Sequence, residues 1–312
     1  MWQKSLWVAA GLLYSACALA FDWHQPAMNS RLWKISKAGE PESYLLGTYH
    51  LGRPDSTLPE PIERIVQNSE VVLTEVRLAD GSSPEAAEDL RAAQERMLDK
   101  ESGQTLSDKI GSGRVQALAE RLQERSATRV TVRRLNQMEP WAAVMVSLAV
   151  RPAELSSEQG VDRQLSRAAA KYHIANEGLE QYRDLPERFI PLPKNQIIEL
   201  LDFKQYHRDQ GEALTRRMFA LYEAHDYPQL MALSADSSAY SQGMSQQGID
   251  FWQHWLEQDL LVQRNQRWLP KLLAVLPKKR ALVAVGMAHL VDDSGLIMQL
   301  RQHGYRVEAV SE

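Results

Sequence analysis

The fold of this chain is decided by the stretch Tyr44-Leu45-Leu46-Gly47-Thr48-Tyr49-His50-Leu51-Gly52. Its apolar run has the length of a β-strand and is bounded by turn-forming residues. Gly47 lets the backbone turn sharply where a side chain would clash. His50 follows three residues later, just past the predicted strand end, where open α/β sheets place their ligand sites.

The same arrangement returns near the C-terminus in the segment Ala281–His289, where an apolar run again meets Gly-x-x-His. A third apolar run, Val71–Val76, carries Glu75 near its end. A lone histidine at a strand end is usually an ordinary hydrogen-bonded residue, so the inference rests on the repeated frame and the acid. Because strand ends on one side of a sheet converge, we expect His50, Glu75 and His289 to share one site.

The order of predicted elements indicates the fold class. Near the N-terminus, two strands that form a hairpin, a helix and a third strand give β-β-α-β, and the C-terminal strand, helix and strand favour a parallel pair. We therefore predict an α/β fold with a mixed central sheet built from both ends of the chain, and a large insertion at 83–276 that is mostly helical. The predicted strands are 31–36, 44–47, 71–76, 173–179, 281–285 and 305–310, the main predicted helices are 59–68, 84–101, 115–122, 139–150, 261–273 and 295–303 with one beginning at Gly160, and 186–193 is a predicted linker.

Composition and charge exclude several classes of protein. The chain has 312 residues, enough to bury one large core or two smaller ones, and 44% of its residues are hydrophobic. Its formal net charge of −4 gives no footprint for nucleic acid. Cys17 is the only cysteine, so the chain can form neither an intramolecular disulfide nor a zinc site made of cysteines.

The N-terminus has the pattern of a secretory signal. Lys4 precedes the mostly apolar run Leu6–Leu19, and Ala18-Leu19-Ala20 supplies a cleavage pattern before Phe21. We expect residues 1–20 to be removed and residues 21–312 to form the exported protein, periplasmic or secreted. A buried helix, a short membrane anchor or a lipoprotein signal at Cys17 is the alternative. We expect no transmembrane segment in the mature chain, because no later run is long and apolar enough.

Two histidines and a carboxylate suit a divalent transition metal, for which manganese, cobalt and zinc are candidates. Such a set leaves positions open for water and substrate, as a catalytic site requires. We predict His50, Glu75 and His289 as ligands, with Glu75 acting as ligand or as general base, and no other cofactor. In the competing chemistry without a metal, one histidine is the general base, Glu75 orients it and the other histidine assists.

Several further motifs make the chain resemble the TraB/GumN family, which is related to the TIKI metalloproteases and more distantly to the erythromycin esterase/ChaN-like proteins. They follow the family's order over most of the mature chain. The matching residues are Tyr44–His50, Val71–Glu75, Pro140-Trp141, Gly160–Asp162, Gly178–Glu180, Arg264-Asn265, Trp268, Val283–Leu290, Gly295 and Gly304-Tyr305.

This resemblance implies that His50, Glu75 and His289 form the active centre, with Arg264 and Glu180 nearby. TIKI proteins are metal-dependent peptidases with two similar Gly-x-x-His motifs, so the resemblance implies a metal-dependent hydrolase of peptide bonds. Arg264 would then stabilise negative charge on the substrate carbonyl. Helix amphipathicity alone also fits Arg264 and its neighbour Asn265 as a surface pair. Against the TIKI pattern, we expect no C-terminal membrane anchor, and the second motif carries Met287-Ala288 where relatives often carry Ala-Gly.

Two other functions fit the same residues. One is a metal-free ester or amide hydrolase of the erythromycin-esterase type. The other is a ChaN-like binding protein that holds haem or another ligand through its histidines and catalyses nothing. For an enzyme, the expected partner is a peptide or small-molecule substrate.

Overall fold

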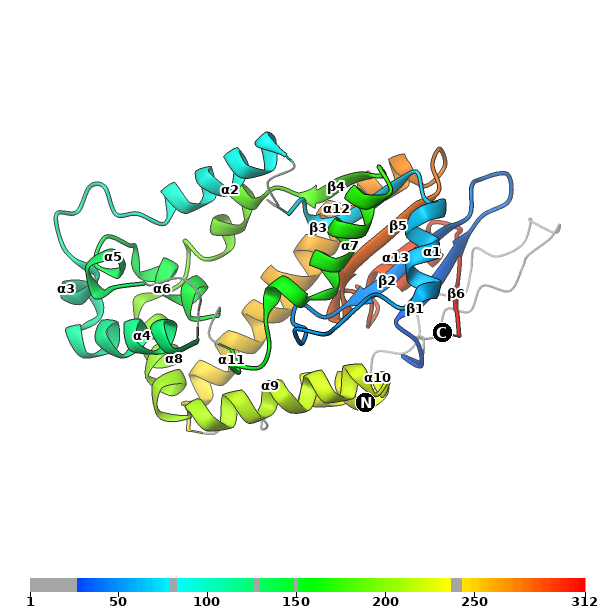
Figure 1. Ribbon diagram of the computed structural model, residues 1–312. Helices are drawn as coiled ribbons and strands as arrows, with labels where there is room; N and C mark the ends of the chain where they lie inside the picture. The colour runs from blue at the N-terminus through cyan, green and yellow to red at the C-terminus, as the bar shows by residue number, and fades with distance from the viewer. Residues whose placement is uncertain (1–26, 79–82, 126–129, 149–150, 237–242, 312) are drawn as a thin grey trace, which may run out of the picture.

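The computed structural model describes residues 27–78, 83–125, 130–148, 151–236 and 243–311. Within these residues, six strands form one mixed sheet in the order β4-β3-β5-β2-β1-β6 (Figure 1). The predicted α/β fold is therefore confirmed. The predicted signal sequence lies outside the described residues, as does the end of the helix predicted for 139–150. The strands are β1 (Leu32–Ser36), β2 (Ser43–Thr48), β3 (Val71–Val76), β4 (Ala175–Glu180), β5 (Ala281–Gly286) and β6 (Arg306–Ala309).

Strands from both ends of the chain lie side by side at the centre of the sheet, as Figure 1 shows for β2 and β5. β5 is parallel to both of its neighbours, with Val283 paired to Leu45 of β2 and to Leu73 of β3. β4 extends this parallel part beyond β3. β1 and β2 form the predicted antiparallel hairpin. Helix α1 (Glu60–Asn68) connects β2 to β3, which confirms the predicted β-β-α-β order.

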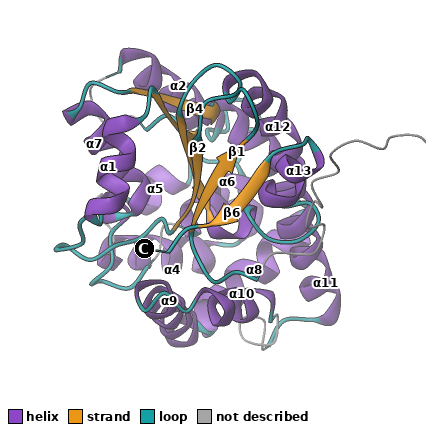
Figure 2. Cartoon of the chain, turned by 90° about the vertical axis from the view of Figure 1, so that its right-hand side faces the viewer, coloured by secondary structure: helices purple, strands orange, loops and turns teal. Residues whose placement is uncertain are grey.

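β5 is an uninterrupted apolar run because helices cover both of its faces. Its residues Ala281–Val285 are all buried. Figure 2 shows α1 and α7 (Val161–Lys171) on one side of the sheet, and α12 (Gln263–Val275) and α13 (Leu296–Gln302) on the other. α12 packs the fully buried Trp268 into this core. Each large apolar side chain buried in this way contributes roughly 1.5–3 kcal/mol to the stability of the fold. The well-packed sheet therefore holds the residues at its edge in fixed positions.

The helices of the middle of the chain gather beside the sheet and have an apolar core of their own (Figure 1). Leu106, Leu135 and Trp141 are among its buried members. A π-helical segment, η4 (Leu256–Val262), connects this part directly to α12. The other helices between β3 and η4 are α2 (Pro84–Arg96), α3 (Leu106–Ile110), α4 (Ser112–Arg125), α5 (Val132–Leu135), α6 (Pro140–Ser147), η1 (Ser157–Gln159), η2 (Tyr182–Arg188), α8 (Lys194–Tyr206), α9 (Arg208–Glu223), α10 (Tyr227–Ala235) and α11 (Gln246–Trp255).

Three local predictions need correction. β5 and β6 are not a parallel pair, because β2 takes the place beside β5 and β6 instead pairs antiparallel with β1, where Trp33 faces Ala309. The linker predicted for 186–193 begins within the 3-10 helix η2, whose last carbonyl, that of Arg188, accepts a hydrogen bond from Trp255 Nε1 at 3.0 Å. The helix predicted to begin at 261 begins as an α-helix only at Gln263, after the π-helical turns of η4.

No helix in the described part of the chain combines the length and the apolar character needed to cross a membrane.

Candidate active site

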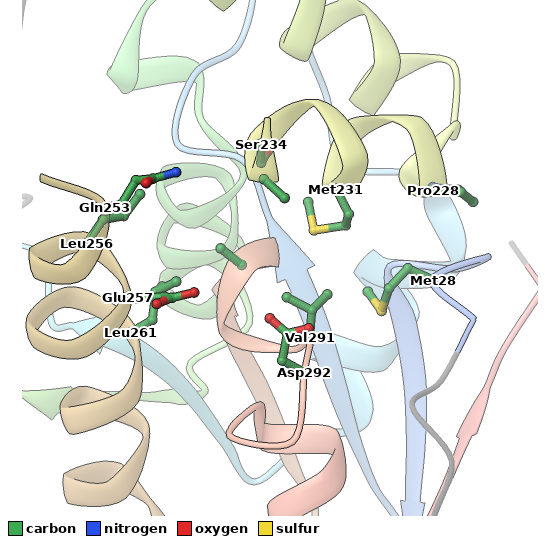
Figure 3. A pocket seen from close by; sticks show the side chains of 12 residues that line it. Met28, Pro228, Met231, Ser234, Gln253, Leu256, Glu257, Leu261, Val291 and Asp292 are labelled. Atoms are coloured by element: carbon green, nitrogen blue, oxygen red, sulfur yellow. The ribbon is translucent and has the colours of Figure 1, made fainter. Parts of the chain in front are cut away.

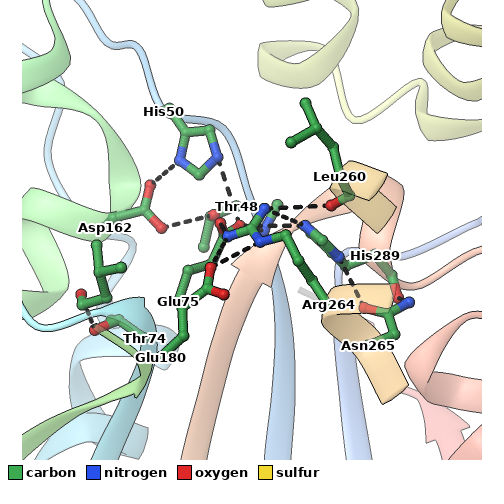
Figure 4. Close-up of polar contacts among 12 residues, drawn as sticks. Thr48, His50, Thr74, Glu75, Asp162, Glu180, Leu260, Arg264, Asn265 and His289 are labelled. Carbon is green, nitrogen blue, oxygen red and sulfur yellow. Dashed lines mark hydrogen bonds and ion pairs between the residues drawn. The ribbon is translucent and has the colours of Figure 1, made fainter. Parts of the chain in front are cut away.

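The parallel strands bring His50, Glu75 and His289 together at one edge of the sheet (Figure 4). His50 follows β2, and Glu75 is the second-last residue of β3. His289 ends the short helix η5 (Met287–His289) after β5. Oε1 of Glu75 lies 3.6 Å from Nε2 of His50 and 3.7 Å from Nε2 of His289. The carboxylate is therefore shared by two imidazoles that are 239 positions apart in the sequence.

Gly47 makes this approach possible, but it lies within strand β2 and not at the sharp turn that the sequence predicted. A Cβ atom on Gly47 would lie 2.2 Å from Sδ of Met287, well inside contact distance. The bare backbone of β2 therefore lets η5 pack directly against it. Any side chain at Gly47 would push η5, and with it His289, away from His50.

His50 is held from its other nitrogen by a carboxylate that the sequence analysis did not identify as functional. Nδ1 of His50 lies 2.7 Å from Oδ2 of Asp162, in the first turn of α7, and Thr48 Oγ1 donates to the second oxygen at 2.9 Å. Asp162 raises the pKa of His50 above its usual value, and Glu75 adds to the effect. The sequence signal for Asp162 is its place in the family motif Gly160–Asp162, a position that also fits an ordinary acid at a helix N-terminus.

His289 has the opposite environment. It is 3% exposed, and its ring lies 4.5 Å from that of Trp268. Its Nδ1 lies 2.8 Å from Oδ1 of Asn265, whose amide nitrogen donates to the carbonyls of His289 and Ser294 at 3.2 and 3.0 Å. Since Oδ1 can only accept, Nδ1 carries the proton and Nε2 keeps its lone pair. Burial lowers the pKa of His289 to about 3, so its imidazole is neutral at pH 7.

Glu75 is ionised although it is buried. Burial alone would raise the pKa of its carboxyl, but Arg264 and the two histidines lower it well below its usual value. Nη2 of Arg264 donates to Oε2 of Glu75, and the backbone N–H of Gly286 donates to Oε1 at 2.8 Å. A buried carboxylate with a cation on one oxygen and a backbone donor on the other stays charged.

Arg264 is the central cation of the site, and the alternative of a surface pair with Asn265 was wrong. The two residues are only 8% and 1% exposed. Besides Glu75, Arg264 donates to Oε1 of Glu180 at 2.7 Å, and its Nη1 lies 3.2 Å from Nε2 of His289. Both residues lie on the buried side of α12, where they contact His289.

Glu180 links Arg264 to a second buried arginine farther from the site. Its second oxygen lies 3.1 Å from Nη2 of Arg188, whose side chain is buried. Arg188, Glu180, Arg264 and Glu75 thus form a buried row of alternating sign. Each member stabilises the charged form of its neighbours, so this row fixes the position of Arg264 beside Glu75.

The donor set fits a divalent metal, provided that Arg264 moves. Ligands of one ion lie about 2.0–2.2 Å from it, so two ligand atoms are roughly 3.0–3.6 Å apart, close to the spacings around Glu75. Gly286 leaves this space free, because its Cβ would lie 3.3 Å from both Oε1 of Glu75 and Nε2 of His50. In the present arrangement Nη1 of Arg264 lies on the lone pair of His289 Nε2. As placed here, no group of three or more His, Cys, Asp or Glu side chains among the described residues could hold a metal ion.

These features define a class of protein: an α/β fold whose parallel strands carry a His–Glu–His centre with a buried arginine at their carboxyl edge. The chain belongs to the TraB/PrgY/gumN family, whose profile matches residues 31–309. This confirms the resemblance found in the sequence.

Individual relatives are distant. Over 270 residues the chain is 26% identical to a Shigella flexneri protein described as uncharacterized protein YbaP, an alignment that covers 86% of this chain and 90% of the relative. The Escherichia coli (strain K12) YbaP is 25% identical with the same coverage. A protein of Amphimedon queenslandica named metalloprotease TIKI homolog is 24% identical over 341 residues, and the alignment covers 96% of this chain but only 65% of that relative. No solved structure matches the chain.

Proposed function

We propose that the protein is a metal-dependent hydrolase that cleaves peptide bonds. The observation that carries the proposal is the convergence of two Nε2 atoms on one oxygen of Glu75, at 3.6 and 3.7 Å, above the bare backbone of Gly286. Each imidazole is held through Nδ1 by a separate partner, the pattern that orients histidine ligands of metals. The name of the Amphimedon queenslandica relative supports the choice of peptide as substrate.

In this proposal His50, His289 and Glu75 hold a divalent transition metal such as manganese, cobalt or zinc. When bound, such an ion polarises a carbonyl group and lowers the pKa of a water molecule. Asp162 and Asn265 fix the two imidazole rings, so the ligands lose little conformational entropy on binding. Binding also requires His50 to lose the proton that Asp162 favours, so the affinity for metal rises with pH.

Arg264 has a separate part in the proposed reaction. Its guanidinium is preorganised by Glu180 and stacks 4.6 Å above the ring of Trp268. If it releases Nε2 of His289, its Nη1 can donate to the negative charge that develops on the substrate carbonyl. Glu75, freed from one of its two donors, can then serve as ligand or as general base.

The experiment that tests this proposal combines metal analysis with a peptide library. Wild type purified without an affinity tag should contain about one ion per chain and should lose activity with chelator. Glu75→Gln keeps the size of the side chain but removes its charge and basicity, so turnover should fall by about 100-fold or more. Retained metal would identify Glu75 as the base, whereas lost metal would identify it as a ligand. Glu177→Gln, at the outer edge strand β4 and away from the site, is the matched control.

Full activity of metal-free protein would contradict the proposal and favour a second candidate, a hydrolase without metal. The observation that favours this candidate is Arg264, which already bridges Glu75 and His289. His50 with Asp162 would then act on water or the leaving group, with Arg264 supporting the charge on the substrate.

We also propose that the protein is exported after removal of residues 1–20, on the sequence pattern alone. The mature protein would comprise residues 21–312, with the mostly helical stretch 83–276 as an insertion that contributes β4 to the sheet. N-terminal sequencing of exported protein should begin at Phe21. Retained Met1 would contradict this, and a lipid on Cys17 would support the lipoprotein alternative.

A further inference from the structure

A hollow lies beside the candidate active site, at the same edge of the sheet (Figure 3). Its volume is about 530 Å³, within the range of roughly 300–1,000 Å³ typical of sites for small ligands. Its walls come from α10, from the π-helical segment η4, from the turn around η5 and from Met28 ahead of β1. The hollow is therefore formed by four segments that are remote in sequence. It is a feature of the tertiary structure and not an irregularity of a single surface loop.

Two of these walls also carry the site. Ala288 and Val291 line the hollow and flank His289 in the sequence. Leu261 lines it as well, next to Leu260, whose carbonyl accepts a hydrogen bond from Arg264 Nη1 at 3.4 Å. π-Helical turns are rare and are frequently found at functional sites. Here one such segment contributes both to the wall of the hollow and to the hydrogen bonding of the arginine. A substrate bound at the site is therefore within reach of the hollow.

The interior of the hollow is largely apolar. Met28, Met231, Leu256, Leu261 and Val291 face it. Leu256 is 40% exposed, so part of its apolar surface is open to a ligand in the hollow. The two methionines are flexible and polarizable, so the wall can adapt to side chains of different shape. The hollow thus suits a medium-sized apolar side chain more than one rigid ligand.

Two carboxylates supply the charge at the hollow. Figure 3 shows Glu257 on η4 and Asp292 after η5 extending into it from opposite walls. No lysine, arginine or histidine is among the described residues that line it. Neither carboxylate has an ion-pair partner within the described part of the chain. Their negative charge is uncompensated there, so the hollow favours a cation.

We propose that this hollow binds the substrate next to the scissile bond and selects an apolar side chain adjacent to a lysine or arginine. The inference rests on the proposed peptide hydrolysis. The apolar side chain would pack among the methionines and aliphatic residues, and the cation would lie between Glu257 and Asp292. The site at His50, Glu75 and His289 would then meet the peptide bond beside this pair of residues.

Two kinds of measurement on the full chain test the proposal. Hydrolysis of paired peptides, one with Leu-Lys and one with Leu-Glu at the same positions, gives the ratio of kcat/KM values. Fluorescence anisotropy gives the binding of the same labelled peptides in a Glu75→Gln background, so that binding is followed without turnover. We expect the Leu-Lys peptide to be preferred about tenfold in both assays, and the preference to weaken with added salt.

Two variants address the charge and the shape of the hollow. Combining Glu257→Gln with Asp292→Asn should reduce the preference for the lysine peptide to about twofold or less. Asparagine tolerates the positive φ of Asp292, +65°, as well as aspartate does, so the loop keeps its conformation. Ala235→Trp should fill the hollow and weaken binding of both peptides by about tenfold or more. The controls are Asp293→Asn and Ala232→Trp, exposed neighbours outside the lining, and they should change neither quantity.

The outcomes separate this inference from the function on which it rests. Selective binding that is lost in the variants, without hydrolysis of any peptide, would support the hollow and contradict the hydrolase. Hydrolysis whose preference is unchanged in the double variant, or binding unchanged by Ala235→Trp, would overturn the inference and leave the hydrolase standing.

Discussion

The two Gly-x-x-His frames of this protein have nearly the same sequence pattern and opposite environments. Both follow adjacent parallel strands, paired so that Thr48 faces Gly286. His50 has a side chain that is 60% exposed, and its Nδ1 lies against the carboxylate of Asp162. The side chain of His289 is 4% exposed and faces the neutral amide of Asn265. The pKa of His50 is therefore raised, whereas that of His289 is lowered to about 3.

The Gly-x-x-His frame therefore fixes the position of an imidazole but does not determine its charge. Two residues outside the frames, one on α7 and one on α12, decide which ring is protonated at neutral pH. A centre with one cationic and one neutral imidazole has both a proton to give and a lone pair to offer. The following predictions alter this contrast in order of decreasing effect, with stabilities and pKa values measured on metal-free protein and hydrolysis measured with metal present.

The largest effect is expected from Arg264→Met, which removes the cation beside the buried imidazole. Glu75 and Glu180 would each lose a buried partner, and such a loss costs about 3–5 kcal/mol. Urea denaturation measures the free energy of unfolding. The matched control is Arg267→Met, on the exposed side of the same helix, with an expected change within about 0.5 kcal/mol. Similar values for both variants would show that Arg264 contributes no more than a surface arginine.

Removing each histidine should separate activity from stability. We expect His289→Ala to destabilise the fold by about 3 kcal/mol, because it leaves a cavity beside Trp268 and removes the donor to Oδ1 of Asn265. His50→Ala removes an exposed ring and should change the free energy of unfolding by less than about 1 kcal/mol. Both should abolish hydrolysis. The reverse order of stabilities, measured by the same denaturation, would contradict the assigned environments.

Exchanging the partners should reverse the two pKa shifts. Asp162→Asn removes the charge that holds the proton on His50, so the pKa of His50 should fall by about 1–3 units. Asn265→Asp places a carboxylate against His289 and should raise the pKa of that ring. NMR titration of the imidazole Cε1–H signals in each single variant measures both values. Values that stay as in wild type would show that Asp162 and Asn265 do not set the contrast.

The two histidines should also act on opposite sides of the stability profile. The pKa of histidine is about 6.5 in the unfolded chain, and that of His289 in the fold is about 3. Because the unfolded chain binds the proton first, the free energy of unfolding falls as pH falls from 6.5 towards 3, by up to about 1.4 kcal/mol per pH unit. His50, with its pKa raised, contributes stability below pH 6.5 that is lost as pH rises through its folded value. Unfolding free energies against pH should show the acid limb flattened in His289→Gln and the alkaline limb flattened in His50→Gln. The same limb flattened in both variants would contradict the opposite shifts.

The sequence predicted the parts of this molecule that depend on local pattern. Apolar runs ending in Gly-x-x-His placed β2 and β5, and the resemblance brought Arg264 and Glu180 near the centre. Asp162 was missed as the partner of His50, because its contact joins residues 112 positions apart. The pairing of β6 with β1 was missed for a similar reason, because it joins the two ends of the chain. It depends on β1, the outer strand of the N-terminal hairpin, having a free edge.

Burial was the other property that the pattern could not give. Arg264 and Asn265 have the polarity of a helix surface, yet both are buried on the face of α12 that also carries Trp268. A hydrophobicity pattern assigns charged residues to solvent, and only the carboxylates of Glu75 and Glu180 make the buried position of Arg264 favourable.

The central claim is that His50, Glu75 and His289 together hold a catalytic ion. The most direct test is a crystal of the protein grown with Mn²⁺, with diffraction data collected at the manganese absorption edge. The expected result is one strong anomalous peak within bonding distance of Nε2 of both histidines and of the Glu75 carboxylate, with Nη1 of Arg264 withdrawn from His289. The account would be contradicted by Arg264 still in contact with His289 and no anomalous peak among these three side chains.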